Sequence, residues 1–121
     1  MTKKEKITIL TGTYDPVTVS DLHKIRKAKA NCDILVIGIH SDYWLVKNVG
    51  GYFMDYDDRK EIVESLKEVN EVFTYDDRID NVQLIKLVKI CYPNSEILYI
   101  CETPEEDAEM KLKGIKRAYI K

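Results

Sequence analysis

Short apolar runs alternate along the chain with segments whose apolar residues are spaced as in helices. Residues 7–10 are β-branched and apolar, and residues 33–39 form an almost continuous apolar run. Such a run is typical of a strand covered on both faces of a parallel sheet. Between the two runs, Leu22, Ile25 and Ala28 recur at helical spacing. The pattern predicts a strand, a turn, a helix and a second parallel strand.

The second half of the chain repeats this alternation after a loop rich in glycine and aromatic residues. The predicted helices are residues 57–68 and 80–91, and the predicted strands are residues 71–75, 96–101 and 115–120. A further helix is expected to begin at Thr103, because threonine, proline and two acidic residues in succession are typical of a helix start. The alternating order predicts a Rossmann-like α/β fold with a doubly wound, parallel sheet of five strands.

Length and composition narrow the class of protein. A chain of 121 residues suits one domain, so residues 1–121 are expected to form a single unit. No apolar run is long enough to cross a bilayer, and the N-terminus lacks a signal-peptide pattern, which predicts a cytoplasmic protein with no membrane partner. A net charge of −2 gives no strong signal for nucleic acid. The three widely spaced cysteines are predicted to be reduced and buried.

The carboxyl ends of the predicted strands locate a candidate site. Ligands of doubly wound sheets bind beyond these ends, where the strand order reverses. The segments at these ends are the turn Gly12-Thr13-Tyr14-Asp15, the pair Ser41-Asp42, and Glu102. A glycine between a strand and a helix lets backbone amides approach an anion. Gly12 therefore marks a candidate phosphate-binding turn.

Residues 7–76 resemble the cytidylyltransferase-like nucleotidyltransferase family, and most closely the glycerol-3-phosphate cytidylyltransferases. The resemblance is carried by Thr11-Gly-Thr-Tyr-Asp15, Ala28-Lys-Ala30 with Cys32-Asp33, Ser41-Asp42, and residues 58–72. It implies transfer of a nucleotide from CTP or ATP to a phosphorylated small alcohol, with Mg²⁺ and with release of pyrophosphate.

Two motifs of the family are missing. The family's His-x-Gly-His motif, whose imidazoles stabilise phosphate charge, is replaced by Thr18-Val-Ser-Asp21, and the Ile-Ser-Thr-x-x-Thr segment has no counterpart. A carboxylate about 4 Å from a phosphate charge costs about 1 kcal/mol in water and about 4 kcal/mol at a dielectric of 20. Loss of one donor to developing charge lowers the rate by roughly 10²–10³. His23 falls on a different helix face from the second motif position. Thr18 and Asp21 therefore predict a pseudoenzyme.

Other positions of the family pattern are retained. The resemblance assigns nucleotide or phosphate binding to Gly12, Thr13, Tyr14, Asp15, Asp42, Lys47 and Arg59. It assigns no catalytic residue. Simpler interpretations remain open: Asp15 before Pro16 is ordinary turn chemistry, Lys47 is solvated, and Arg59 pairs with the adjacent Asp57 and Asp58.

The sequence thus favours a divergent, catalytically impaired cytidylyltransferase-like protein that binds a nucleotide or phosphorylated small molecule. If it is active, CTP or ATP with Mg²⁺ is expected. The alternative is a non-catalytic binding or scaffold module that self-associates as a homodimer through the loop that carries Trp44, Tyr52, Phe53 and Met54.

Two further sets of charged residues, three aspartates and a basic cluster, are not assigned a function. Asp15, Asp21 and Asp42 offer oxygen ligands at the strand ends, but nothing in the sequence brings them together, and no metal site is predicted. The basic residues of the first helix, which are Lys24, Arg26, Lys27 and Lys29, are interpreted as a solvated face.

Overall fold

The computed structural model describes residues 4–76, 80–101 and 116–119. Its elements, in chain order, are β1 (Glu5–Gly12), α1 (Val19–Lys29), β2 (Ile34–His40), α2 (Asp42–Asn48), α3 (Tyr56–Glu64), β3 (Glu71–Tyr75), α4 (Asn81–Cys91), β4 (Ser95–Cys101) and β5 (Lys116–Tyr119). The helix expected after Thr103 and the candidate residue Glu102 lie outside the described residues.

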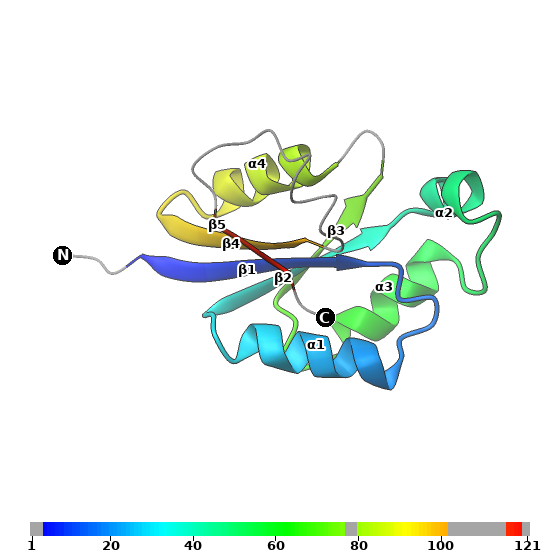
Figure 1. Ribbon diagram of the computed structural model, residues 1–121, viewed down its shortest axis with the longest axis horizontal. Coiled ribbons are helices and arrows are strands. Elements are labelled where there is room, and N and C mark those ends of the chain that lie inside the picture. The colour runs from blue at the N-terminus through cyan, green and yellow to red at the C-terminus, as the bar shows by residue number, and fades with distance from the viewer. Residues whose placement is uncertain (1–3, 77–79, 102–115, 120–121) are drawn as a thin grey trace.

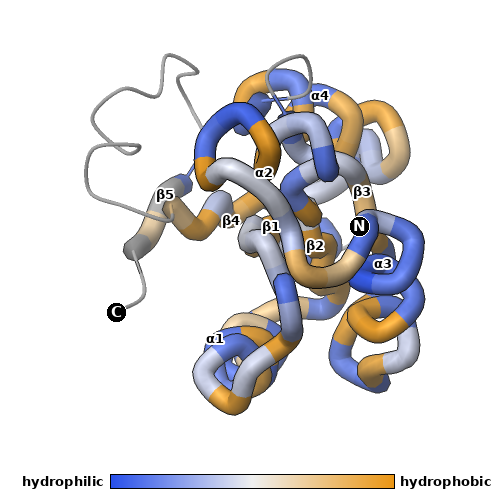
Figure 2. The backbone as a smooth tube through the Cα atoms, turned by 90° about the vertical axis from the view of Figure 1, so that its right-hand side faces the viewer, coloured by the Kyte–Doolittle hydropathy of each residue, from blue (hydrophilic) through white to orange (hydrophobic). Residues whose placement is uncertain are grey.

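The strands form one sheet in the order β3-β2-β1-β4-β5, and every neighbouring pair is parallel. Helices α1 and α3 cover one face of the sheet and α4 covers the other (Figures 1 and 2). This confirms the prediction of a Rossmann-like α/β fold with a parallel sheet. The prediction of five strands needs qualification, because four strands form the body of the sheet and β5 adds only four residues at its edge.

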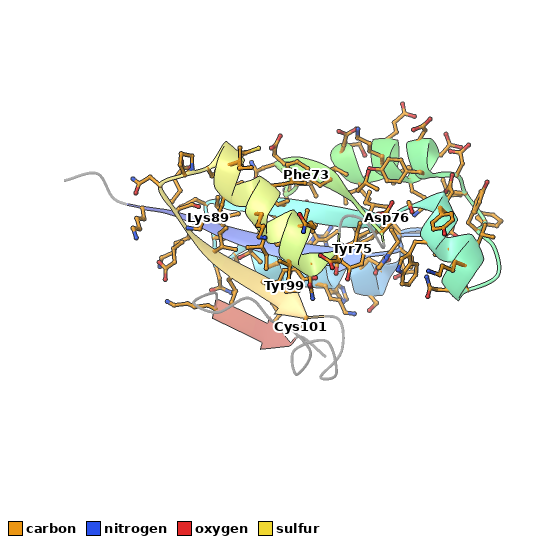
Figure 3. The ribbon with its side chains drawn as sticks, turned by 90° about the horizontal axis from the view of Figure 1, so that it is seen from above. Phe73, Tyr75, Asp76, Lys89, Tyr99 and Cys101 are labelled. Carbon is orange, nitrogen blue, oxygen red and sulfur yellow. The ribbon has the colours of Figure 1, made fainter. Side chains whose placement is uncertain are left out.

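The two faces of the sheet carry two separate apolar cores, because side chains alternate along each strand. On β1, Ile7 and Ile9 pack with Leu84 of α4, whereas Leu10 packs with Ile25 of α1. All five side chains are buried, and each stabilises the fold by roughly 1.5–3 kcal/mol. In Figure 3, α4 lies over β4, which ends at Cys101. The cores fix the helices, and so they fix the positions of the strand ends.

The reversal of strand order lies between β1 and β4. From β1 the sheet extends through β2 to β3 on one side and through β4 on the other. The chain leaves β1 for α1 on one face, whereas β3 leads to α4 on the opposite face (Figure 1). The connections diverge at this point, which leaves room for a ligand beyond the strand ends.

Helix α2 corrects the sequence-based picture, which placed a loop after the second strand. Ser41 caps this helix, because its hydroxyl accepts a hydrogen bond from the Trp44 backbone N–H at 3.0 Å. Only Leu45 of α2 is buried, and Tyr43 and Val46 are exposed. A helix with one buried position leaves no apolar stripe in the sequence, so the pattern gave no indication of it.

The end of α3 and the burial of the cysteines also differ from the sequence-based predictions. Helix α3 ends at Glu64, four residues earlier than predicted. Cys32, Cys91 and Cys101 are all free thiols, but the prediction that all three are buried is wrong, because only Cys101 is buried, Cys32 is half-buried and Cys91 is exposed. None of the described helices has the length and apolar character needed to cross a bilayer.

Candidate functional site

The turn after β1 is shaped by a buried tyrosine. Tyr14 adopts a left-handed backbone conformation, with φ of 50°, and its side chain is only 4% exposed. A Cβ atom placed on Gly12 would lie 3.0 Å from two atoms of the Tyr14 ring. A side chain at position 12 would therefore crowd the Tyr14 ring, which lies against the Gly12 backbone. The peptide bond that follows, Asp15-Pro16, is cis.

A pocket of about 150 Å³ opens at the strand-order reversal. The residues that line it come from the ends of β1 and β4, the turn and the first half of α1: Leu10, Thr11, Gly12, Tyr14, Asp21, Lys24, Ile100 and Cys101. Sequence reasoning named Gly12, Tyr14 and Asp21 among these. It missed Thr11 and Cys101, and it interpreted Lys24 as part of a solvated face.

One polar side chain distinguishes this pocket. Lys24 is half-buried and has no hydrogen bond or ion pair to any residue that the structure describes. Thr11 also lines the pocket, but its side chain lies on the face of the sheet that α4 covers, beside Leu84, and its hydroxyl oxygen is buried. Lys24 is therefore the polar group that a ligand on the α1 side of the sheet would meet.

The first turn of α1 carries a reciprocal capping box at Thr18 and Asp21, the two positions that the sequence comparison assigned to the family's histidine motif. The Thr18 hydroxyl accepts from the Asp21 backbone N–H at 3.2 Å, and the Asp21 carboxylate accepts from the Thr18 backbone N–H at 2.9 Å. This arrangement satisfies two backbone donors of the helix N-terminus. Thr18 and Asp21 thus have a structural role, and His23 is exposed on α1.

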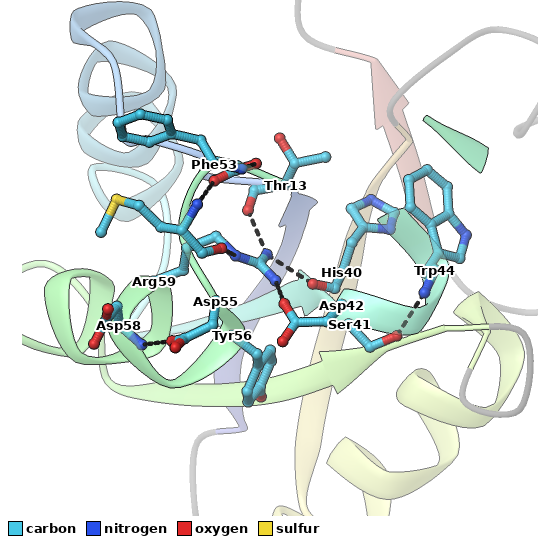
Figure 4. A network of polar contacts seen from close by, with 12 residues as sticks. Thr13, His40, Ser41, Asp42, Trp44, Phe53, Asp55, Tyr56, Asp58 and Arg59 are labelled. Carbon is cyan, nitrogen blue, oxygen red and sulfur yellow. Dashed lines mark hydrogen bonds and ion pairs between the residues drawn. The ribbon is translucent and has the colours of Figure 1, made fainter. Parts of the chain in front are cut away.

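Arg59 is the centre of a second polar cluster, beside the pocket (Figure 4). Its side chain is 0% exposed. Its Nε donates to the Met54 carbonyl at 2.9 Å, and Nη1 donates to the carbonyls of Thr13 at 2.8 Å and His40 at 2.7 Å. Nη2 pairs with the Asp42 carboxylate at 2.7 Å. Arg59 therefore joins the ends of β1 and β2 to the segment before α3, and does not pair with the adjacent Asp57 and Asp58.

Asp15 strengthens the same connection from the turn. Its two carboxylate oxygens accept hydrogen bonds from the backbone N–H groups of Phe53, at 2.7 Å, and Met54, at 2.6 Å. Asp15 and Arg59 thus hold residues 53 and 54 against the turn from two sides. We call the side chains of Asp15, Asp42 and Arg59, with the backbone groups that they bind, the Arg59 network.

The structure therefore divides the predicted site residues into three groups. Gly12 and Tyr14 line the pocket, whereas Thr13, Asp15, Asp42 and Arg59 belong to the Arg59 network. Lys47 is exposed on α2, apart from the pocket lining. Binding of a ligand by any of these residues stays a prediction.

The sequence did not predict an aromatic cluster at the end of β2, which consists of His40, Trp44 and Tyr75. The buried His40 ring lies 3.9 Å from the Trp44 ring, between centroids, at an interplanar angle of 34°. It meets the Tyr75 ring edge-on at 4.7 Å. Trp44 therefore packs inward on His40, as Figure 4 also shows, instead of lying in an exposed loop.

The two described residues with clearly shifted pKa values, Tyr92 and Glu96, lie at the end of the sheet opposite the pocket. Burial raises the pKa of the Tyr92 hydroxyl, and the nearby Glu71 raises it further. A hydrogen bond from Lys116 lowers the pKa of the Glu96 carboxyl. Both residues lie near the start of β4, whereas the pocket lies beyond its end.

The donor set around the pocket does not fit a cation held by the protein alone. Among residues 4–76, 80–101 and 116–119, no three His, Cys, Asp or Glu side chains gather as a metal site requires. Asp15 and Asp42 are engaged in the Arg59 network, and Asp21 is engaged in the capping box. Divalent Mg²⁺ commonly takes one or two carboxylates together with substrate phosphates, so any ion here would depend on phosphates of the ligand.

A parallel sheet of this order, with a pocket at the reversal between β1 and β4, defines a Rossmann-like domain of the nucleotide-binding type. Residues 9–119 match the model of a family described as cytidylyltransferase-like. The chain belongs to this cytidylyltransferase-like family.

One curated protein is similar to part of the chain, and solved structures share its fold. The chain is 33% identical over 61 residues to ethanolamine-phosphate cytidylyltransferase of Mus musculus; the match spans 50% of the chain and 15% of that protein. Its fold is similar to a lipopolysaccharide core biosynthesis protein from Thermoplasma volcanium, with a TM-score of 0.79, 18% identity and 97% of each chain covered. It is also similar to a putative nicotinate-nucleotide adenylyltransferase from Vibrio parahaemolyticus, with a TM-score of 0.66, 14% identity, and 97% and 77% of the two chains covered.

Proposed function

We propose that the pocket between β1 and β4 binds a nucleotide or another phosphorylated small molecule, and that the chain has lost most of the family's transfer chemistry. The observation that carries this proposal is the capping box of Thr18 and Asp21, which stands where related enzymes have two phosphate-binding histidines. Both named relatives that act on nucleotides or phosphate esters, the cytidylyltransferase and the adenylyltransferase, agree with the class of ligand.

The side chains of the pocket supply binding groups without supplying catalysis. Lys24 offers a positive charge for a phosphate, and Gly12 allows close approach to the backbone. The capping box uses the backbone N–H groups of Thr18 and Asp21, so these two donors are not available to a phosphate. Any remaining transfer activity would use CTP or ATP with Mg²⁺ and would lack the paired imidazoles that stabilise charge during in-line attack.

Calorimetric titration with CTP, ATP, CMP and AMP tests the binding proposal. The wild-type chain is expected to bind at least one of them, and Lys24→Ala is expected to weaken that binding about tenfold through loss of one charge-assisted hydrogen bond. Lys27→Ala, an exposed lysine on the same helix, is the matched control and should bind as the wild type does. No heat with any ligand would contradict the proposal.

A separate assay tests for remaining catalysis. Pyrophosphate release from CTP or ATP, with Mg²⁺ and a phosphorylated alcohol, is expected to stay at the level of Gly12→Trp, a variant that fills the pocket. Circular dichroism must show that this variant is folded. Release well above that level would show that the chain is an active transferase.

Self-association is a second candidate function, and a specific observation favours it. Five large apolar side chains of α2 and the following segment are exposed: Tyr43, Val46, Val49, Tyr52 and Phe53. Phe53 is 80% exposed, although its backbone is fixed by Asp15. We propose that this surface joins two copies in a homodimer. Sedimentation equilibrium is expected to show a dimer that Phe53→Ser dissociates; a wild-type monomer at high concentration would contradict it.

A further inference from the structure

The pocket places one negative and one positive side chain around its ligand. Asp21 and Lys24 both line it, one turn apart on α1. Of the described residues that line the pocket, these are the two that carry a charge. The side chains therefore contribute no net positive charge, whereas a site for a triphosphate normally gathers several cations or donors.

The Asp21 carboxylate is held in place. Its Oδ2 atom accepts the hydrogen bond from the Thr18 N–H at 2.9 Å, and loss of such a cap costs roughly 1 kcal/mol. A bound phosphate therefore cannot displace the carboxylate without also opening the first turn of α1. The negative charge is a fixed feature of the pocket wall.

The buried cation of the adjacent Arg59 network cannot compensate for it. Arg59 donates to three carbonyls and to Asp42, and its side chain is fully buried. Its charge is already paired, and its removal from these partners would leave Asp42 alone in a half-buried position. Lys24 remains as the lining group that can pair with a phosphate.

On the basis of the proposed function, we infer that the pocket selects a phosphate monoester that carries hydroxyl groups, such as a nucleoside monophosphate, and rejects nucleoside triphosphates. Lys24 pairs with the single phosphate. Asp21 accepts hydrogen bonds from ligand hydroxyl groups. Each additional phosphate adds repulsion from Asp21 that no other described side chain of the lining offsets. Asp21 is thus the residue that determines specificity.

The variant Asp21→Asn isolates the charge. An asparagine carbonyl at this position can still accept the Thr18 N–H, so the capping box is kept while the negative charge is removed. Cytidine, CMP and CTP, and the matching adenine series, are titrated without Mg²⁺ into the wild type and the variant. Asp55→Asn is the matched control, because Asp55 caps α3 in the same way and does not line the pocket.

The wild type is expected to bind the monophosphate at least tenfold more tightly than the triphosphate. Asp21→Asn should raise triphosphate affinity at least about fivefold and reduce this preference, since two charges about 4 Å apart interact by about 1 kcal/mol even in water. Raised salt should shrink the difference between the two proteins. Asp55→Asn should behave as the wild type does.

Two results would overturn the inference while leaving the proposed function in place. One is a wild-type affinity for triphosphate equal to or above that for monophosphate, with no change of the ratio in Asp21→Asn. The other is tight triphosphate binding that needs both Mg²⁺ and Asp21, which would make the carboxylate a ligand of the ion that arrives with the nucleotide. If neither protein bound any of the ligands, the proposed function itself would be overturned, and this inference with it.

Discussion

The pocket lies at the carboxyl ends of β1 and β4 and the Arg59 network at the ends of β1 and β2, yet their polar groups differ in what they contact. In the network, Arg59 and Asp15 use their polar atoms on backbone groups and on Asp42. In the pocket, Lys24 has no such partner among the described residues. Gly12 and Tyr14 keep the family pattern and line the pocket, but the retained charged residues Asp15, Asp42 and Arg59 hold the fold together. The two charged residues of the described pocket lining, Asp21 and Lys24, lie outside the pattern.

This difference changes how a retained motif is interpreted. A match at Asp15, Asp42 and Arg59 agrees with the family, but in this chain each residue is accounted for by its contacts within the protein. Retention of these residues is therefore evidence for the fold. Evidence about the ligand comes from Asp21 and Lys24, and the following variants test this division.

Arg59→Met is expected to have the largest effect. It leaves Asp42 and three carbonyls without their donor, and removal of one partner from a buried ion pair costs roughly 3–5 kcal/mol. Urea denaturation measures this loss in the free energy of unfolding. Lys60→Met, on the next residue of α3, should change it by less than about 0.5 kcal/mol. If the variant had normal stability but had lost ligand binding, Arg59 would be a ligand-binding residue and its structural role would be contradicted.

Asp15→Ala should have the next largest effect. It removes two hydrogen bonds to an ionised carboxylate, for a combined loss of about 2–3 kcal/mol, because solvent partly replaces the lost bonds. Hydrogen exchange at the amides of Phe53 and Met54 is expected to become faster. Glu61→Ala, at an exposed position of α3, serves as the control. Unchanged exchange at both amides would contradict the proposed role of Asp15.

Thr18→Ala tests the capping box, which holds the pocket residue Asp21 in place. Loss of the cap should lower the free energy of unfolding by about 1 kcal/mol, whereas Ser20→Ala, exposed in the same turn, should leave it nearly unchanged. Thermal melts of both variants make the comparison. Equal stability of the two variants would show that the capping box contributes nothing, and would weaken the structural explanation of the lost histidine motif.

The smallest effect is expected far from both regions, at Glu96. Its pKa is lowered in the folded state by the hydrogen bond from Lys116, so its stabilising contribution is present above the ordinary carboxyl pKa and is lost as the pH falls through the lowered value. In melts between pH 6 and pH 3, Glu96→Gln should show a slightly weaker pH dependence than the wild type. Ligand affinity at neutral pH should not change, and a change would mean that the two ends of the sheet are coupled.

The fold could be predicted in outline because burial imposes a regular pattern. The apolar runs of β1, β2 and β4 and the helical spacing in α1 and α4 follow directly from the faces that these elements bury. Helix α2 could not be found in this way, since Leu45 is its single buried residue. Its start is set by the Ser41 cap, which is a local signal shared with many turns.

The candidate site was predicted less completely, for a related reason. Helical periodicity indicates which side of α1 meets the sheet, and it correctly placed Ile25 and Ala28 in the core. It does not indicate which residue at the margin of that side lies beside the end of β1, so Lys24 was interpreted as solvated. Nor does a sequence show that the hydrogen bonds of Arg59 are already occupied.

By itself, the sequence determined the alternation of the five strands with α1, α3 and α4, the glycine turn after β1 and the residues Thr18 and Asp21 at the start of α1, because these are local properties of the chain. The tertiary structure decided the rest. It placed Asp21 and Lys24 on one pocket, gave Thr18 and Asp21 to a capping box, and enclosed Arg59 among acceptors from three segments. These are contacts across long stretches of sequence or choices among competing partners, and only packing fixes which partner a polar group finds.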